Sequence, residues 1–92
     1  MKMNKEKLQK ELLTLKKETE IKSLTIYNDD INTFDHVIDS LIKICKHDSI
    51  QAEQCTWIIH MKGKCSVKHG SFLKLKPLCQ AFLDLGINAS IE

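Results

Sequence analysis

The sequence predicts a small α+β domain, in which three helices pack on one face of a three-stranded antiparallel sheet in the order β-α-α-β-α-β. Two patterns predict this fold. Apolar residues recur every three or four positions where helices are expected, and they alternate or are β-branched in three short segments. The chain has 92 residues, which is enough for one domain. A flexible, partly helical extension, residues 1–22, is expected to precede the domain at residues 23–92.

The extension is rich in Lys, Glu and Leu. Leu8, Leu12 and Leu15 share one helical face. So short a helix is marginal alone, which favours a solvated tail. A helix that lies on a membrane surface or against a partner is the alternative. The chain has no apolar run near the roughly 20 residues that span a bilayer.

The first strand and helix are separated by a polar turn. Residues 24–27 favour a strand, and residues 28–32 form the turn. Thr33 is a suitable N-cap, and the apolar spacing that follows predicts a helix over residues 34–46.

A second helix is predicted to begin after Asp48 or Ser49, because Asp48 with Gln51 resembles a capping box. Gly63 is predicted to end it. Its expected apolar face consists of Ala52, Cys55, Trp57, Ile58 and Ile59.

The last three elements are a strand, a helix and a strand. Residues 64–69 alternate as a short strand. Pro77 suits the first turn of a helix that runs to Leu85, where Gly86 stops it. Residues 87–91 alternate again as the final strand.

The charge pattern argues against nucleic-acid recognition. All 14 basic residues are Lys, whereas Arg makes most bidentate contacts to bases and phosphates. Seven Lys and four Glu give residues 1–22 a net charge of +3, and seven Lys and eight acids give residues 23–92 a net charge of −1. A near-neutral domain therefore carries a basic extension.

The four cysteines are predicted to be free thiols in a reducing cytoplasm. No two form a Cys-x-x-Cys pair, and the first 30 residues contain no secretory signal. No spacing of the four Cys and four His fits a zinc module, so no metal or other cofactor is expected.

One constellation has the chemistry to hold a cation. Asn28, Asp29 and Asp30 follow the first strand, and His60 lies near the end of the second helix. An ammonium group offers three N–H donors, which amide, carboxylate and neutral imidazole atoms can accept. The alternative is structural: an Asn-Asp-Asp turn that caps a helix, and a His at a helix end.

These residues resemble the motifs of ClpS, the adaptor family of the bacterial Clp protease. The first motif is the run Tyr27-Asn28-Asp29-Asp30, and the second is Ile59-His60-Met61-Lys62-Gly63-Lys64. The spacing from Asn28 to His60 is 32 positions, which matches the family. The closing residues 87–92 resemble the last strand of the family. The resemblance covers residues 23–92.

The resemblance implies an adaptor and not an enzyme. It implies binding of proteins whose N-terminal residue is Phe, Tyr, Trp or Leu, and delivery to a hexameric AAA+ unfoldase resembling ClpA, in the bacterial cytoplasm and as a monomer. The residues it assigns to the α-amino group are Asn28, Asp30 and His60, with Asp29 as an alternative carboxylate. The side-chain pocket that it implies is lined by Ile26, Asn32, Phe34, Val37, Thr56, Ile59 and Ile87.

The chain departs from the family in the expected pocket. Asn32-Thr33-Phe34 stands where the family has Thr-Pro-Met, and Thr56 replaces a second Met. One change enlarges a side chain and the other shrinks one, which predicts a retained but reshaped pocket. The alternative is an interaction module on the same fold that regulates the unfoldase without binding N-degrons.

Overall fold

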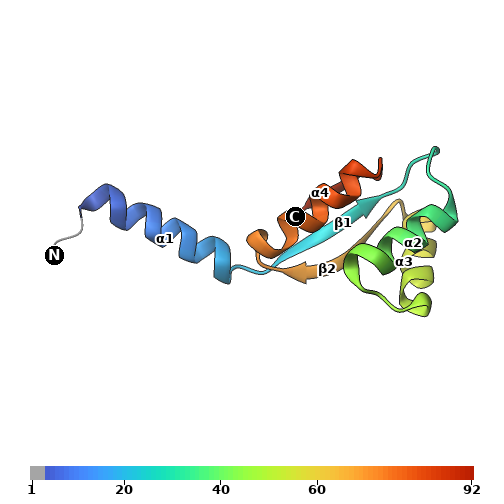
Figure 1. Cartoon of the computed structure of the whole chain (residues 1–92), viewed down its shortest axis with the longest axis horizontal. Coiled ribbons are helices and arrows are strands. Elements are labelled where there is room, and N and C mark those ends of the chain that lie inside the picture. The colour runs from blue at the N-terminus through green and yellow to red at the C-terminus, as the bar shows by residue number, and fades with distance from the viewer. Residues whose placement is uncertain (1–3) are drawn as a thin grey trace.

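The computed structural model describes residues 4–92 and contains four helices and three strands in that range. The elements are α1 (Lys5–Thr19), β1 (Lys22–Tyr27), α2 (Phe34–Cys45), α3 (Ser49–Lys62), β2 (Lys64–Gly70), α4 (Phe72–Asp84) and β3 (Ala89–Ile91). After α1 the order is β-α-α-β-α-β, which confirms the predicted α+β fold. Figure 1 shows α1 at one end of the molecule and the α2–α3 pair at the other.

The sheet has two chemically different faces. Its strand order is β2-β1-β3, and both pairings are antiparallel. Ile26 lies opposite Ala89 on the face that joins the core. Thr25 lies opposite Ser66 and Ser90 on the other face. Because side chains alternate along a strand, this hydroxyl-rich face points away from the core, and Thr25 on it is still only 3% exposed.

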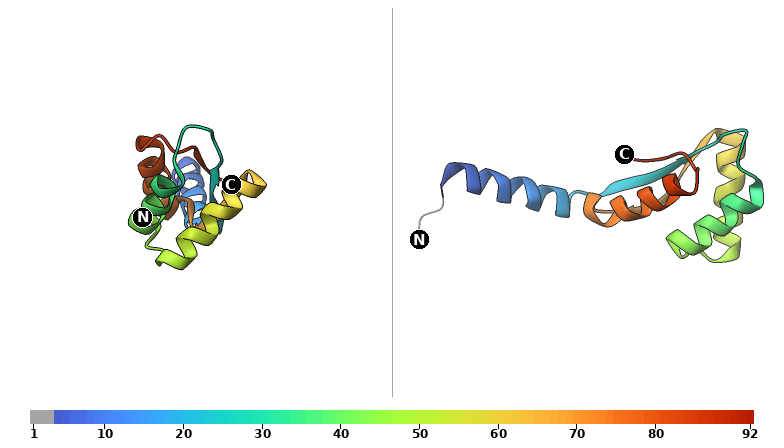
Figure 2. Two further views of the ribbon diagram at one scale, coloured as in Figure 1. Left: turned by 90° about the vertical axis from the view of Figure 1, so that its right-hand side faces the viewer. Right: turned by 45° about the horizontal axis from the view of Figure 1, so that its top comes forward.

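The core lies between the sheet and helices α2, α3 and α4 (Figure 2). Two side-chain caps fix where α2 and α3 begin. Thr33 Oγ1 accepts the N–H of His36 at 3.1 Å, and Asp48 Oδ1 accepts that of Gln51 at 2.7 Å. Both caps agree with the sequence analysis. For the second helix it gave Asp48 or Ser49 as the cap, and Asp48 is the one observed. The fully buried core side chains include Leu24, Ile26, Leu41, Leu75, Phe82 and Ile87.

A glycine turn places the end of α3 beside the end of β1. Gly63 caps α3 with a φ of 91°, a left-handed conformation that suits glycine. Its carbonyl accepts the backbone N–H of Asn28 at 2.9 Å. The polar turn after β1 is therefore fastened to the His60 end of α3.

Helix α4 begins five residues earlier than predicted, and Pro77 lies inside it. Ser71 is the N-cap, with Oγ 3.3 Å from the backbone N of Lys74. The prediction that Pro77 opens the helix was wrong, because a hydroxyl cap and an apolar side chain at Leu75, 1% exposed, already fix an earlier start. The final strand also starts later, at Ala89, since Ile87 belongs to the turn that follows Gly86.

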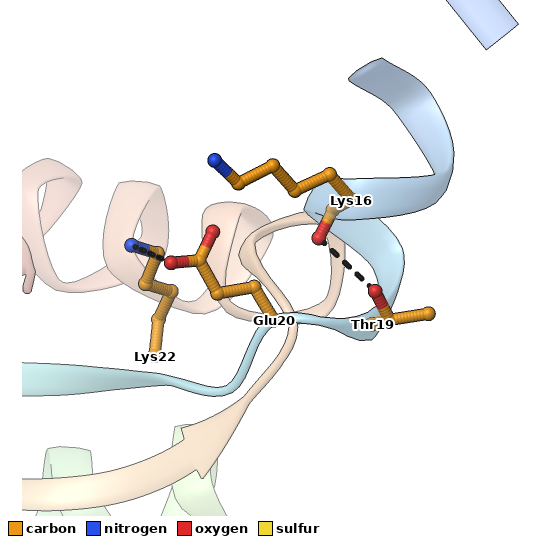
Figure 3. A network of polar contacts seen from close by, with 4 residues as sticks. All are labelled: Lys16, Thr19, Glu20 and Lys22. Atoms are coloured by element: carbon orange, nitrogen blue, oxygen red, sulfur yellow. Dashed lines mark hydrogen bonds and ion pairs between the residues drawn. The ribbon is translucent and has the colours of Figure 1, made fainter. Parts of the chain in front are cut away.

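Helix α1 is regular but lightly held. Its four leucines are exposed, and its main contacts with the domain are to α4. At its end, Thr19 donates to the carbonyl of Lys16, and Lys22 Nζ lies 3.2 Å from Glu20 Oε1 (Figure 3). The partly helical extension thus forms a helix over Lys5–Thr19, and residues 1–3 of the extension lie outside the described residues. Between residues 4 and 92 no helix is long and apolar enough to cross a bilayer.

Candidate functional site

The turn after β1 is organised by a single carboxylate. Asp29 Oδ1 accepts the backbone N–H groups of Ile31, at 2.9 Å, and Asn32, at 2.8 Å. Its Oδ2 accepts the side-chain N–H of Asn32 at 2.7 Å. The backbone hydrogen bond from Asn32, with smaller contributions from the other two, holds the pKa of Asp29 below its ordinary value. This carboxylate is therefore kept ionised, and Oδ2 retains lone pairs for another donor.

Asn32 joins that turn to the far end of the chain. Its side-chain nitrogen donates to the carbonyl of Gly86 at 2.9 Å as well as to Asp29. The turn after β1 is thereby tied to the connection between α4 and β3. Residue Ile87, which follows Gly86, is 1% exposed and faces the same region.

A small cavity lies where these segments meet the ends of α2 and α3. It encloses about 20 Å³, close to the space that one water molecule needs. Its lining consists of Tyr27, Asn28, Asp29, Asn32, Val37, Ile59 and Ile87. Polar acceptors and apolar walls thus share one cavity.

Six of the eleven residues predicted for the site line this cavity: Asn28, Asp29, Asn32, Val37, Ile59 and Ile87. The structure separates the two candidate carboxylates, because Asp29 faces the cavity and Asp30 is exposed outside it. Tyr27 also lines the cavity and was not predicted. Its position as the last residue of β1, directly before Asn28, is the signal that could have identified it.

Two predicted pocket residues lie inside the protein and not on the cavity lining. Ile26 is completely buried beneath the sheet and belongs to the core. Thr56 is 3% exposed, and its hydroxyl donates to the carbonyl of Ala52 at 2.7 Å within α3. Thr56 lies near the wall residue Ile59 on the same helix, but its side chain is buried in the protein. It therefore has a structural role and does not line the cavity.

Phe34 and His60 lie beside the cavity in an aromatic cluster with Trp57. The ring centroids of Phe34 and Trp57 are 4.7 Å apart, with an angle of 63° between the planes. His60 lies 6.3 Å from each of the other two rings, also edge to face. Phe34 is one turn from the lining residue Val37, and His60 follows the lining residue Ile59. The cluster therefore flanks the cavity on its α2–α3 side.

The expected apolar face of α3 is corrected in part. Ala52 and Ile59 are buried and Cys55 is half-buried, as predicted, but Trp57 and Ile58 are 49% and 44% exposed. The buried residues of α3 are Ala52, Thr56 and Ile59, which lie three or four positions apart on one side of the helix. Trp57 and Ile58 lie outside that side.

Charged and thiol groups elsewhere do not form a second centre among residues 4–92. No three His, Cys, Asp or Glu side chains in that range are placed to hold a metal ion. All four cysteines are free thiols. Burial raises the pKa of Cys45 from 9.0 to about 11. It does the same for Cys65, from 9.0 to about 11.

Comparison with known proteins identifies the family. The family model of the ATP-dependent Clp protease adaptor protein ClpS matches residues 17–86. No curated protein sequence matches the chain. Among solved structures, ClpS2 of Agrobacterium tumefaciens bound to L-phenylalaninamide superposes with a TM-score of 0.76 at 15% identity, over 79% of this chain and 95% of that one. A match over most of the chain, together with the shared fold, shows that the protein belongs to the ClpS family of Clp protease adaptors and is not an enzyme.

Proposed function

We propose that the protein binds the free N-terminus of proteins that begin with Phe, Tyr, Trp or Leu and delivers them to a hexameric AAA+ Clp unfoldase. One observation carries the proposal: hydrogen-bond acceptors for an ammonium group and apolar walls for a side chain line the same cavity. The relative bound to L-phenylalaninamide holds a ligand with these two features, a free amine and a phenyl ring. Its fold is the fold of this chain.

In this proposal the α-amino group is held by side-chain oxygens at the end of β1. Asn28 and the free lone pairs of Asp29 Oδ2 accept two of its N–H groups, and His60 accepts the third when neutral. Of the two neighbouring carboxylates, we assign Asp29 to the α-amino group, because it lines the cavity and Asp30 does not. An N-acetylated substrate has lost the positive charge and two donors, so the acceptors would be desolvated without compensation.

The substrate side chain occupies the space between the apolar walls. Val37, Ile59 and Ile87 are the walls, and the half-buried Phe34 is the neighbouring group that we expect to move. Burial of a Phe or Leu side chain contributes about 1.5–3 kcal/mol, and hydrogen bonds to a charged group contribute about 1.5–3 kcal/mol. Together they suit micromolar to submicromolar binding after the cost of association.

The family supports a proposal for the unfoldase and the cellular setting. A Clp protease adaptor presents substrates to the unfoldase that feeds the peptidase, and we place the protein in the bacterial cytoplasm, acting as a monomer. The basic N-terminal extension is the segment that we assign to the unfoldase. Its helix lies at the end of the molecule opposite the α2–α3 pair (Figure 1), and these two helices supply the cavity residues Val37 and Ile59, so both partners can be bound at once.

A second function is favoured by the size of the cavity. At about 20 Å³ it admits no amino-acid side chain without movement of its walls. A site that stayed closed would leave an adaptor-like module that regulates the unfoldase without N-degron binding. If Phe34 moves away from Trp57, the cavity can admit a substrate side chain. If it does not move, only the regulatory function remains.

The deciding experiment is fluorescence anisotropy of a labelled peptide that begins with Phe. Unlabelled competitors are the same peptide, its N-acetylated form and a Met-initiated form. Competition that needs both the free amine and the bulky side chain supports the N-degron function, and Asp29→Ala should abolish it while Asp84→Ala, an exposed carboxylate on α4, should not. Absence of binding to Phe, Leu, Trp and Tyr peptides would instead support the regulatory module.

A further inference from the structure

Helix α3 carries an exposed apolar surface that the domain does not cover. Trp57 is 49% exposed and Met61 75% exposed, one turn apart on the same side of the helix. Ile50 is 69% exposed on the first turn of that helix. Exposed apolar side chains that gather on one helix are typical of a binding surface.

This surface begins at the rim of the cavity. The Trp57 ring lies edge to face with Phe34, at 4.7 Å between centroids, and 6.3 Å from His60. His60 in turn follows Ile59, a wall of the cavity. A chain whose first residue enters the cavity would have its second residue one step away, about 3.8 Å along the backbone. Because Trp57 packs against Phe34 beside the cavity, it is placed to meet the side chain at that second position, and Met61 extends the same side of the helix by one turn.

The opposite rim has different chemistry. It is formed by the turn after β1, whose Asn28, Asp29 and Asn32 line the cavity. An apolar side chain gains nothing from those polar groups, whereas it gains contact area on an indole ring and a thioether. The two rims thus differ in polarity, and the α3 rim is the apolar one.

We propose that Trp57 and Met61 form a subsite for an apolar second residue of the substrate, an inference that rests on the N-degron function proposed above. Trp57 supplies a broad, rigid face, and Met61 supplies an adaptable one. The substrate class becomes a bulky hydrophobic first residue followed by an apolar second residue. A second copy of this chain or a surface of the unfoldase could cover the same helix, and the test separates these occupants.

The test uses the full chain and four peptides that begin with Phe and differ only at the second position, which is Leu, Phe, Gly or Ser. The chain has a single Trp, so intrinsic fluorescence reports directly on Trp57. We expect the Leu and Phe peptides to bind about five-fold more tightly than the Gly peptide. They should also shift the Trp57 emission further to the blue, because the indole loses water.

Variants assign the preference to the subsite. Met61→Ser should reduce the second-position preference to within about two-fold while the Gly peptide binds as before. Trp57→Ala should reduce the same ratio of affinities, whatever its effect on the Gly peptide, because Phe34 also packs against Trp57. Ile50→Ala is the matched control, exposed on the same helix but about 10 Å further along it. Met61→Ser keeps the test available if removal of Trp57 unfolds the protein through loss of its contact with Phe34.

Two results would overturn the inference and leave the proposed function intact. These are equal affinity for all four peptides, or a preference that survives both Trp57→Ala and Met61→Ser. A change in oligomeric state or in unfoldase binding in those variants, with peptide preference unaltered, would assign the surface to another occupant and overturn the subsite. Failure of every Phe peptide to bind would overturn the N-degron function and the subsite together.

Discussion

Asp29 and Asp30 are chemically identical neighbours with different surroundings. Asp29 accepts three hydrogen bonds from Ile31 and Asn32 and lines the cavity. Asp30 is exposed and lies outside the cavity. Because the hydrogen bonds favour the ionised form, the pKa of Asp29 is lowered. The negative charge that an ammonium group needs is therefore fixed in position at residue 29.

Substitution of these two residues should give unequal effects. Asp29→Ala removes both the ionic acceptor and the organiser of the turn, so we expect peptide affinity to fall at least about 30-fold. Asp30→Ala is the matched control and should change affinity less than about three-fold. Titration of a Phe-initiated peptide by anisotropy measures both variants. Equal losses, or a larger loss at Asp30, would contradict the assignment.

Phe34 should set which first residues fit. The cavity is small, and the ring of Phe34 beside it is held against Trp57. Phe34→Ala should therefore improve binding of Trp- and Phe-initiated peptides relative to the Leu-initiated peptide, while it lowers stability by up to about 3 kcal/mol. Competition anisotropy with the three peptides gives the ranking. An unchanged ranking would show that Phe34 does not limit the pocket.

The buried thiol of Cys45 predicts a loss of stability in alkali. Burial raises its pKa from 9.0 to about 11, so the folded state disfavours the thiolate. The contribution is complete below pH 9.0 and is lost progressively as the pH rises toward 11, because the unfolded chain releases the proton first. Urea midpoints at about pH 7.5 and 10.5 for the wild type and Cys45→Ala measure it.

The comparison of the two proteins isolates the thiol from other titrating groups. Cys45→Ala lacks the thiol but keeps every lysine and tyrosine. The stability advantage of the wild type should therefore shrink between the two pH values. A constant advantage would mean that the thiol does not ionise differently in the two states.

At the scale of elements, local signals predicted where helices α2 and α3 begin but not which faces they bury. Thr33 and Asp48 act within three residues of themselves, so the caps can be recognised in the sequence. The exposure of Trp57 depends on which elements pack against α3, which is a tertiary property. The prediction for Pro77 failed because the Ser71 cap and the burial of Leu75 fix an earlier start, although proline in a helix interior costs about 3 kcal/mol.

Pro77 should weaken the helix that contains it. It has no N–H, so the carbonyl of Leu73 lacks its regular helical partner. Relative to proline, alanine in a helix interior gains up to about 3 kcal/mol, of which greater freedom of the unfolded chain cancels about 0.4–1 kcal/mol. We therefore expect Pro77→Ala to raise the free energy of unfolding by about 1–2 kcal/mol.

Urea denaturation of Pro77→Ala and of Lys76→Ala, an exposed neighbour in the same helix, measures this effect. The lysine variant should stay close to the wild type because it removes no backbone constraint. If the proline variant were no more stable than the wild type, α4 would have to be already relaxed around Pro77.

At the scale of the molecule, the candidate site exists only where distant segments converge. Asn28 follows β1, Val37 and Ile59 come from two helices, and Ile87 precedes β3. The sequence and the family resemblance predicted six of the seven lining residues, because the place of each residue in its helix, turn or strand can be inferred from the sequence. The volume of the cavity could not be predicted, because it results from how side chains of separate elements, among them Val37, Ile59 and Ile87, pack together.

The extension and the cavity lie at opposite ends of the sheet. Figures 1 and 2 show α1 leaving the start of β1 and pointing away from the rest of the chain. The six residues of β1, at about 3.3 Å each, separate Lys22 from the turn after Tyr27 by roughly 20 Å. None of the residues that line the cavity belongs to α1. Substrate binding and the role proposed for the extension are thus separable in space.

Deletion of residues 1–18 should separate the two roles in function. We expect affinity for a Phe-initiated peptide to stay within about two-fold of the wild type, since the site is remote. Degradation of an N-degron substrate by the unfoldase and its peptidase should be abolished, because the segment assigned to the unfoldase is gone.

A full-length variant with serine at Leu8, Leu12 and Leu15 tests whether the exposed leucines or the length of the segment matter. Loss of degradation in both proteins would assign recognition to the leucines, whereas retained degradation in the serine variant would assign it to length and charge. Weaker peptide binding in the deletion variant would contradict the separation and show that α1 supports the domain through α4.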